Sequence, residues 1–218
     1  MISRRKFVLT SIAAATVMPK SALAHHTKKR PFKVDPKYLP QDVTFRGYKP
    51  GMIVVDPHNH FLYLTGKWGK ARRYGVGVGK AGLAFKGSAT IERKAEWPSW
   101  RPTDNMIRRD PGRYKKYAKG MPGGPNNPLG ARALYLYRNN RDTYYRIHGT
   151  NQPSSIGRSV SAGCIRMIND HVKDLYTRVK LGTKVVVLWS TDGMFTTHKY
   201  PSPWLKDNPI ARRGSVIQ

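Results

Sequence analysis

The sequence predicts a mainly β domain with one principal helix. Short stretches of alternating apolar residues recur along positions 48–190, and Gly, Pro, Asn and His residues separate them. This is the pattern of strands joined by tight turns. Helical spacing of apolar residues, at i, i+3, i+4 and i+7, is clear in one place, at Val172, Leu175, Tyr176 and Val179. Beyond an N-terminal leader about 190 residues remain, the length of one domain.

The strands follow in chain order. Residues 52–56 and 61–64 are apolar and flank Pro57-His58-Asn59-His60, so we expect a hairpin. Residues 74–79 alternate glycine with larger residues, as a strand does. They lack the following helix and the Lys-Ser/Thr pair of a phosphate-binding loop. Further strands are expected at residues 88–95, 133–137, 144–148 and 183–189.

The helix and a long loop complete the domain. We expect Asn169 to cap the helix, Asp170 to lie in its first turn and Gly182 to end it. Capping and solvation account for Asp170 and Asp174, so neither is taken as a catalytic group. Residues 97–130 are rich in Pro, Gly and Asn. Loops of this length inside a compact domain are usually functional, and we expect this one to cover a substrate groove.

Residues 1–24 have the pattern of an export signal. Arg4 and Arg5 precede an apolar stretch at residues 7–18, and Ala22-Leu23-Ala24 matches a signal-peptidase site. The stretch is shorter than the roughly 20 apolar residues of a spanning helix. We therefore expect an exported chain that starts at His25 and has no transmembrane segment. Paired arginines indicate the twin-arginine route, although they also occur in ordinary secretion signals.

Two flanking segments are expected to be arms. Residues 25–47 are polar, basic and interrupted by three prolines, and residues 191–218 are similar. The catalytic domain would then occupy residues 48–190. No metal site is expected, because the histidine pairs His25/His26 and His58/His60 lack further spaced ligands.

The net charge is strongly positive. The chain has 40 Lys and Arg residues and 12 Asp and Glu residues, which gives a net charge of +28. The leader holds four of the bases and no acid, so the rest of the chain has a net charge of +24. Inside a cell, nucleic acid would be the default partner. The export signal, the scatter of the bases and the lack of a nucleic-acid-binding motif argue against that partner. An anionic envelope polymer suits this charge better.

The single cysteine, Cys164, lies in Ser161-Ala162-Gly163-Cys164-Ile165-Arg166, sixteen positions after His148. A lone thiol cannot form an intramolecular disulfide. It is either a nucleophile with His148 as its base or a small buried hydrophobic residue, and the spacing alone leaves both open. A solitary thiol risks oxidation in an oxidising compartment. An exported chain that keeps one is therefore expected to need it, which favours a reactive role for Cys164.

The residues around Cys164 resemble the L,D-transpeptidases, the YkuD-domain enzymes that cross-link bacterial peptidoglycan. The resemblance rests on Ile147-His148-Gly149-Thr150, Ile156-Gly157 and the run from Ser161 to Met167, and extends over residues 52–189. It implies a β-sandwich of mixed sheets with the principal helix after the catalytic cysteine, and no cofactor. One position departs from the pattern: Ala162 stands where the family usually has histidine. A role for that side chain is therefore in doubt, whereas its backbone N–H remains.

The resemblance also implies a role for each site residue. Cys164 would be the nucleophile, His148 the general base and acid, and the Gly149 carbonyl the group that orients His148. The backbone N–H groups of Ala162, Gly163 and Cys164 would form the oxyanion hole. The side chains of Ser161 and Arg166 would bind substrate. The enzyme would attack the stem-peptide amide before the terminal D-alanine, in the periplasm at the cell wall. It would pass the acyl group to a second stem, forming a 3→3 crosslink, to an envelope protein or to water.

Two other functions stay open. A cysteine peptidase that trims peptidoglycan stems would usually show an Asn or Asp that orients the histidine. A non-catalytic, basic cell-wall-binding protein would leave Cys164 inert. We expect an enzyme to lower the pKa of the thiol, so thiol reactivity at neutral pH distinguishes the two classes.

Overall fold

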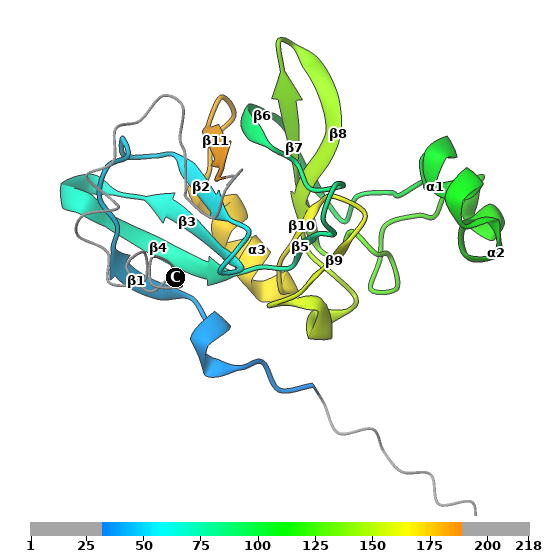
Figure 1. Cartoon of the computed structure of the whole chain (residues 1–218), viewed down its shortest axis with the longest axis horizontal. Coiled ribbons are helices and arrows are strands. Elements are labelled where there is room, and N and C mark those ends of the chain that lie inside the picture. The colour runs from blue at the N-terminus through cyan, green and yellow to red at the C-terminus, as the bar shows by residue number, and fades with distance from the viewer. Residues whose placement is uncertain (1–31, 189–218) are drawn as a thin grey trace, which may run out of the picture. The chain divides into compact units, whose positions relative to one another are not determined.

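The computed structural model describes residues 32–188. The predicted export signal, its cleavage site and the C-terminal arm lie outside the described residues. Within them the chain is mainly strands, with three α-helices, as Figure 1 shows. The elements are β1 (Gln41–Thr44), β2 (Ile53–Asp56), β3 (Phe61–Thr65), β4 (Lys70–Gly75), β5 (Val78–Gly79), β6 (Gly87–Glu96), α1 (Asp104–Arg109), α2 (Pro111–Tyr114), β7 (Arg132–Arg138), β8 (Arg141–His148), β9 (Ser159–Ser161), β10 (Ile165–Arg166), α3 (Asn169–Arg178) and β11 (Lys184–Val187).

Nine strands form one mixed sheet, in the order β1-β4-β3-β2-β11-β6-β7-β8-β10. The pairs β11–β2 and β10–β8 are parallel and the other neighbours are antiparallel. Strands β5 and β9 form a small parallel pair beside it. The mainly β class and the mixed strand directions predicted from the sequence are confirmed. No helix within residues 32–188 has the length and apolar character needed to cross a membrane.

One apolar core holds the strands and α3 together. Ile53 from β2, Leu134 from β7 and Leu175 from α3 are fully buried in the same cluster. The helical stripe predicted from the sequence is therefore the buried face of α3. Burying a side chain of this size contributes about 1.5–3 kcal/mol, and Figure 1 shows α3 between the β1–β4 part of the sheet and β7–β8.

The predicted hairpin is confirmed as β2 and β3, and the strands expected at residues 88–95, 133–137, 144–148 and 183–189 correspond to β6, β7, β8 and β11. Residues 74–79 differ from the prediction, because they contain the end of β4 and all of β5. Between these strands the backbone of Gly77 exchanges two hydrogen bonds with Arg166, at 2.9 and 2.7 Å. A Cβ on Gly77 would lie 2.4 Å from the Ser155 carbonyl oxygen, so only glycine fits this approach.

The segment predicted as an N-terminal arm contains a strand. β1 pairs antiparallel with β4, and Phe45 directly after it is 4% exposed. The interpretation of residues 25–47 as an arm is therefore wrong for residues 41–44. Pro36 begins a short 3-10 helix, Pro36–Tyr38. The strand that pairs with β1 is about 30 residues away in sequence and leaves no local signal.

Both predicted ends of the helix are wrong. Asn169 is the first residue of α3 and Ile168 is its cap, without a side-chain hydrogen bond. The Asn169 Oδ1 atom instead accepts hydrogen bonds from the backbone N–H groups of Ala131 and Thr150, at 3.0 and 3.2 Å. The helix ends at Arg178 because Val179 is extended, and Gly182 lies in the following turn.

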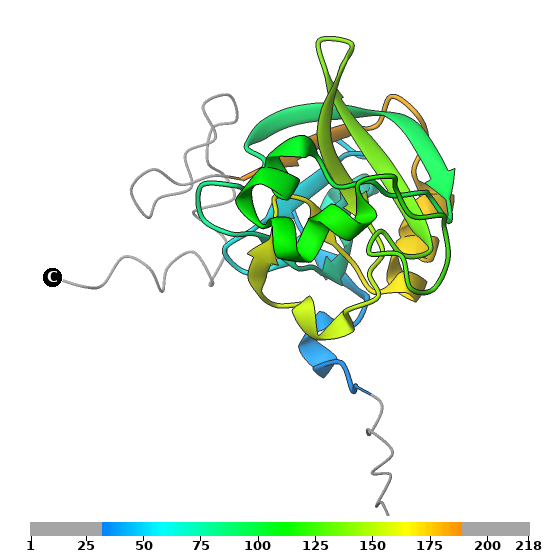
Figure 2. The same cartoon turned by 90° about the vertical axis from the view of Figure 1, so that its right-hand side faces the viewer.

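The predicted loop at residues 97–130 contains two short helices. Thr103 caps α1 through its Oγ1 atom, and Asp110 caps α2 through its carboxylate. Two antiparallel backbone hydrogen bonds between Trp100 and Met121, at 2.9 and 2.7 Å, join the two ends of the segment that contains these helices. We call residues 100–121 the α1–α2 segment. Figures 1 and 2 show its helices on the side of the molecule where β8 and β10 lie.

Asp174 joins α3 to β4. Its carboxylate accepts hydrogen bonds from the Tyr74 hydroxyl at 2.8 Å, from Arg72 Nε at 3.1 Å and from Arg178 Nε at 2.8 Å. Tyr74 is fully buried in the core. The sequence analysis explained Asp174 by solvation on an open helix face. That interpretation missed the structural role of Asp174.

We expect Asp174→Asn to lower the free energy of unfolding by about 1–3 kcal/mol at neutral pH. Burial acts to raise the pKa of Asp174, but hydrogen bonds from Tyr74, Arg178 and Arg72 outweigh it and hold this pKa below its usual range. The stabilisation is thus complete above the unfolded-state pKa and disappears as the pH falls through the lower folded-state pKa. Urea unfolding of both proteins at neutral pH and near about pH 3 measures it.

Asp170→Asn is the matched control. Asp170 forms an exposed ion pair with Lys173 at 3.1 Å, and such pairs contribute at most about 1 kcal/mol. Equal losses of stability in the two variants would show that the Asp174 network does not hold α3 on the sheet.

Candidate active site

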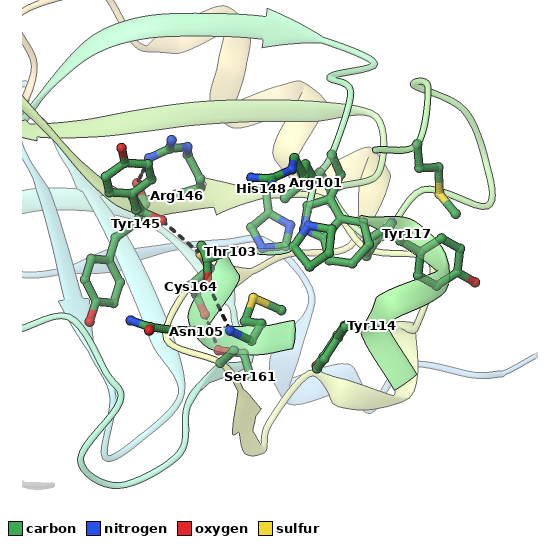
Figure 3. Close-up of a pocket in the computed structure, with 18 of the residues that line it drawn as sticks. Arg101, Thr103, Asn105, Tyr114, Tyr117, Tyr145, Arg146, His148, Ser161 and Cys164 are labelled. Atoms are coloured by element: carbon green, nitrogen blue, oxygen red, sulfur yellow. Dashed lines mark hydrogen bonds between the residues drawn. The ribbon is translucent and has the colours of Figure 1, made fainter. Parts of the chain in front are cut away.

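Parallel strands bring His148 and Cys164 together. His148 is the last residue of β8, and it pairs in register with Arg166 of β10. Cys164 directly precedes β10. Both side chains line one open cavity of about 1390 Å³, and Figure 3 shows them facing it. The two residues singled out in the sequence therefore share one site.

The ring of His148 is oriented by a backbone carbonyl. Its Nδ1 atom lies 2.5 Å from the oxygen of Gly149, and because a carbonyl only accepts, Nδ1 carries the hydrogen of the neutral ring. The other nitrogen, Nε2, is then left as the basic atom. Gly149 is packed against Asn169: a Cβ there would lie 2.2 Å from Asn169 Oδ1. Asn169 Oδ1 also accepts a hydrogen bond from the N–H group of Thr150. Asn169 therefore positions the Gly149 carbonyl that orients His148.

His148 is neutral at physiological pH. It is 4% exposed, and burial, assisted by the positive charge of Arg166, lowers its pKa to about 4. Contacts with the carbonyls of Gly149 and Leu129 act in the opposite direction and are outweighed. The histidine thus enters a reaction as a free base, without a bound proton.

Cys164 is partly exposed in the cavity. Its Sγ atom lies 3.9 Å from the carbonyl oxygen of Tyr144, a distance within reach of a weak S–H hydrogen bond. Burial raises the pKa of the thiol, while the backbone N–H and the charge of Arg146 act to lower it. In the free protein the direction is thus opposite to the lowered thiol pKa expected from the sequence, because desolvation outweighs the other contributions. Thiol reactivity of the free protein therefore does not separate an enzyme from a wall-binding protein.

A bulge in β8 presents this backbone to the thiol. Tyr144 has φ +61, and the pairing of β7 with β8 shifts register there. Asp142 braces the bulge: its carboxylate accepts from Tyr144 N at 2.7 Å and holds both Arg146 Nη atoms at 2.7 and 2.8 Å. A non-glycine residue at such a φ is uncommon, and these conformations concentrate at functional sites.

Ser161 stabilises the turn that carries the cysteine. Its hydroxyl donates to the Cys164 carbonyl at 2.6 Å and accepts from the Gly163 N–H at 3.1 Å. The side chain is almost fully buried although it contributes to the cavity lining, so its predicted role in substrate binding stays a prediction beside this structural one. The Gly163 N–H donates to this hydroxyl in the free protein, and its predicted role as an oxyanion donor stays a prediction. Within residues 32–188, the N–H groups of Ala162 and Cys164 make no hydrogen bond.

Gly163 cannot carry a side chain. It has φ +133, and a Cβ would lie 2.6 Å from both the Leu83 carbonyl oxygen and Tyr145 Cε1. We expect Gly163→Ala to displace Cys164 and to lower activity by about 100-fold, the usual cost of a 1 Å misplacement in an active site. Turnover of a stem peptide and a thermal melt of the variant measure this effect.

Gly51→Ala controls for backbone strain alone. Gly51 has φ +80 with nothing within 4 Å of an added Cβ, so it should lose some stability and keep its activity. Wild-type turnover by Gly163→Ala would mean that this turn does not position the thiol.

Arg166 lies beside the reacting pair. It is half-buried, and its nearest polar side-chain contact is Gln152 Oε1, 3.4 Å from Nη1. Burial lowers the pKa of its guanidinium, although an arginine remains charged. Ala162 is exposed at the cavity, so the departure from the family pattern leaves room at the site without a clash.

The α1–α2 segment forms another wall of the cavity. Figure 3 shows Tyr114 and Tyr117 from this segment on the far side of the pocket from Cys164, and Arg101 next to His148 in this view. The expectation that residues 97–130 cover a groove is supported, although the individual lining residues were not predicted. The signal was present in the sequence, since Trp100, Tyr114 and Tyr117 are interleaved with bases.

Residues 50–187 match the family model of the L,D-transpeptidase catalytic domain, YkuD. This chain belongs to the L,D-transpeptidase family. The predicted resemblance is confirmed over most of the described residues, and the fold is the one that the family implies. Cys164, His148 and Gly149 occupy the positions of the L,D-transpeptidase motif on which that prediction was based.

Named relatives support the family. The probable L,D-transpeptidase ErfK/SrfK of Escherichia coli is 38% identical over 173 residues, which are 78% of this chain and 54% of that protein. A putative L,D-transpeptidase of Fuscovulum blasticum is 35% identical over 139 residues, 63% of this chain and 69% of that protein. The chain therefore spans about half the length of the Escherichia coli relative.

A solved structure from Brucella melitensis is also similar. It is described as a probable carnitine operon oxidoreductase, shares 62% identity and has a TM-score of 0.50, covering 71% of this chain and 96% of that one. The oxidoreductase name is that protein's own. In this L,D-transpeptidase family member, the glycine-rich residues 74–79 are the end of β4, the two residues after it and β5, not a dinucleotide-binding loop.

Proposed function

We propose that this protein is an exported peptidoglycan L,D-transpeptidase in which Cys164 is the nucleophile. Its substrate is the amide between the third residue of a stem peptide and the terminal D-alanine. Family membership supports the reaction class. The observation that carries the assignment of residues is that Cys164 lines the same cavity as a neutral His148 whose Nδ1 is held by the Gly149 carbonyl.

In the first half-reaction, Nε2 of His148 takes the proton from the Cys164 thiol as sulfur attacks the amide carbonyl. A sulfur–carbon bond forms and the carbonyl oxygen becomes an oxyanion. The carbon–nitrogen bond then breaks, and the imidazolium returns its proton to the departing amine of D-alanine. A thioester on Cys164 remains. The pKa of about 4 for His148 makes it a base at neutral pH that is ready to accept this proton.

The oxyanion is held by backbone N–H groups. Of the three candidate donors, the N–H groups of Ala162 and Cys164 make no hydrogen bond within residues 32–188. The N–H group of Gly163 donates to the Ser161 hydroxyl. Oxyanion donors of this kind contribute about 3–4 kcal/mol to the stability of a transition state. The developing negative charge also lies near Arg146 and Arg166, whose charges lower the pKa of the thiol.

In the second half-reaction an amine attacks the thioester. His148 takes a proton from the amine, a carbon–nitrogen bond forms and the thiol is released. A second stem would give a 3→3 crosslink, and an envelope protein would become attached to the wall. The export signal predicted at residues 1–24 supports the periplasm as the site of this reaction, and the net charge of the chain suits retention at an anionic wall.

Incubation of the protein with purified sacculi, followed by mass spectrometry of the muropeptides, tests the proposal. Crosslinked dimers linked 3→3, or released D-alanine, are the expected products. Cleavage of casein without any change in the muropeptides would support a general cysteine peptidase instead, and unchanged sacculi with tight binding would support a wall-binding protein.

A further inference from the structure

The cavity around Cys164 is strongly cationic. Seven Lys and Arg side chains line it against a single acid, Asp104. Within residues 32–188, Arg101 pairs with Asp104 at 2.9 Å and Arg146 with Asp142 at 2.7 Å. The other five have no carboxylate partner in that part of the chain, and they are Arg108, Arg109, Arg113, Lys116 and Arg166.

Arg166 lines the same cavity as Cys164 and as Arg113 and Tyr114 of the α1–α2 segment. Burial lowers the pKa of its guanidinium, and the charge of Arg113 acts in the same direction. Its contact with Gln152, at 3.4 Å, is neutral and long. A half-buried guanidinium beside another cation is poorly compensated, and a bound anion removes both the repulsion and the unmet hydrogen-bonding capacity.

Arg113 is held in place on the opposite wall. Asp110 accepts a hydrogen bond from its backbone N–H at 3.1 Å. Its guanidinium lies 5.3 Å from the centroid of the Tyr114 ring, and that ring packs against Trp100 with centroids 6.4 Å apart. The guanidinium of the exposed Arg113 therefore lies over one aromatic ring of the cavity that Arg166 also lines.

We propose that Arg113 and Arg166 form a carboxylate subsite that makes peptides with a free carboxylate beside the scissile amide better substrates than their amidated forms. A guanidinium binds a carboxylate through two parallel hydrogen bonds. The proposal rests on the acyl-transfer function argued above and names its substrate class. Arg108, Arg109 and Lys116 extend the positive field that attracts such a peptide.

Three matched stem tetrapeptides test the subsite on the full chain. One has all carboxylates free, one has the terminal carboxylate amidated, and one has the side-chain carboxylate of the third residue amidated. We expect kcat/KM to fall by about 10–100-fold for one amidated peptide, as for loss of a hydrogen-bonded charge. That peptide identifies which carboxylate the subsite binds.

Arg113→Gln should remove most of this preference by slowing turnover of the free peptide while leaving that of the amidated one unchanged. Lys115→Gln is the matched control, because Lys115 is an exposed base of the same segment that does not line the cavity. A wild-type protein indifferent to amidation, or an Arg113→Gln variant that keeps the full preference, overturns the proposal.

Binding to the Cys164→Ala chain separates this inference from the proposed function. Calorimetry with the uncleaved peptides should show weaker binding of the amidated form even where no chemistry occurs. If the wild type turns over no peptide but the binding preference is present, the acyl-transfer function is wrong and the subsite stands. If binding is equal for all peptides, the subsite is wrong.

Discussion

Replacement of Cys164 by alanine is expected to abolish acyl transfer while the fold remains intact. Removing the nucleophile of a related acyl-transfer enzyme lowers turnover by about 10⁴-fold or more, and no second cysteine exists in the chain. Cys164 is partly exposed and makes one weak side-chain contact, so its loss should cost little stability. Release of D-alanine from a stem tetrapeptide, with a thermal melt of both proteins, measures the two effects.

Ser161→Ala is a useful companion to this variant. It leaves the thiol in place and removes two hydrogen bonds of the turn, so it should lower both stability and turnover. Continued crosslinking of sacculi by the Cys164→Ala chain would contradict the assignment of the nucleophile.

His148→Gln is expected to lower turnover by about 10²–10⁴-fold, the contribution of a positioned general base. Because burial holds the pKa of His148 at about 4, the wild-type rate should stay level from neutral pH downwards and fall only as the pH passes through that value. The acid limb of the profile should be absent from the variant. A pH series of kcat/KM for both proteins measures it.

Thiol alkylation gives a second measurement on the same pair. Burial raises the pKa of Cys164, so alkylation of the free protein should be slow at neutral pH and increase in alkaline solution, with a similar profile in His148→Gln. Rapid alkylation at neutral pH that is lost in the variant would indicate a preformed thiolate–imidazolium pair and contradict the neutral resting state.

The sequence predicted those elements whose buried face repeats with a regular local period. Alternation identified β2 and β3, and the apolar stripe identified the buried face of α3, because both periods reflect a single buried face. The spacing of Cys164 and His148 left a catalytic pair and a buried thiol both open, and the resemblance to a family implied the pair. The parallel pairing of β8 with β10 that brings the two segments together is a tertiary fact, which the sequence analysis did not predict.

Tertiary partners account for the predictions that were wrong. Asn169 has the residue type of a cap, but its amide oxygen is taken by the N–H groups of Ala131 and Thr150. The hydroxyl of Ser161 donates to the Cys164 carbonyl within the turn, a structural role that the sequence analysis did not predict. The pKa of Cys164 depends on how deeply the thiol is surrounded, and composition carries no information about that depth.

Intact-protein mass spectrometry tests the central claim most directly. The full chain is mixed with a stem tetrapeptide and quenched in acid, which preserves a thioester. The account predicts an added mass equal to the peptide without its terminal D-alanine, located on Cys164 by peptide mapping and absent from Cys164→Ala. Turnover of the tetrapeptide with no adduct on Cys164, or with the adduct on another residue, would contradict the account.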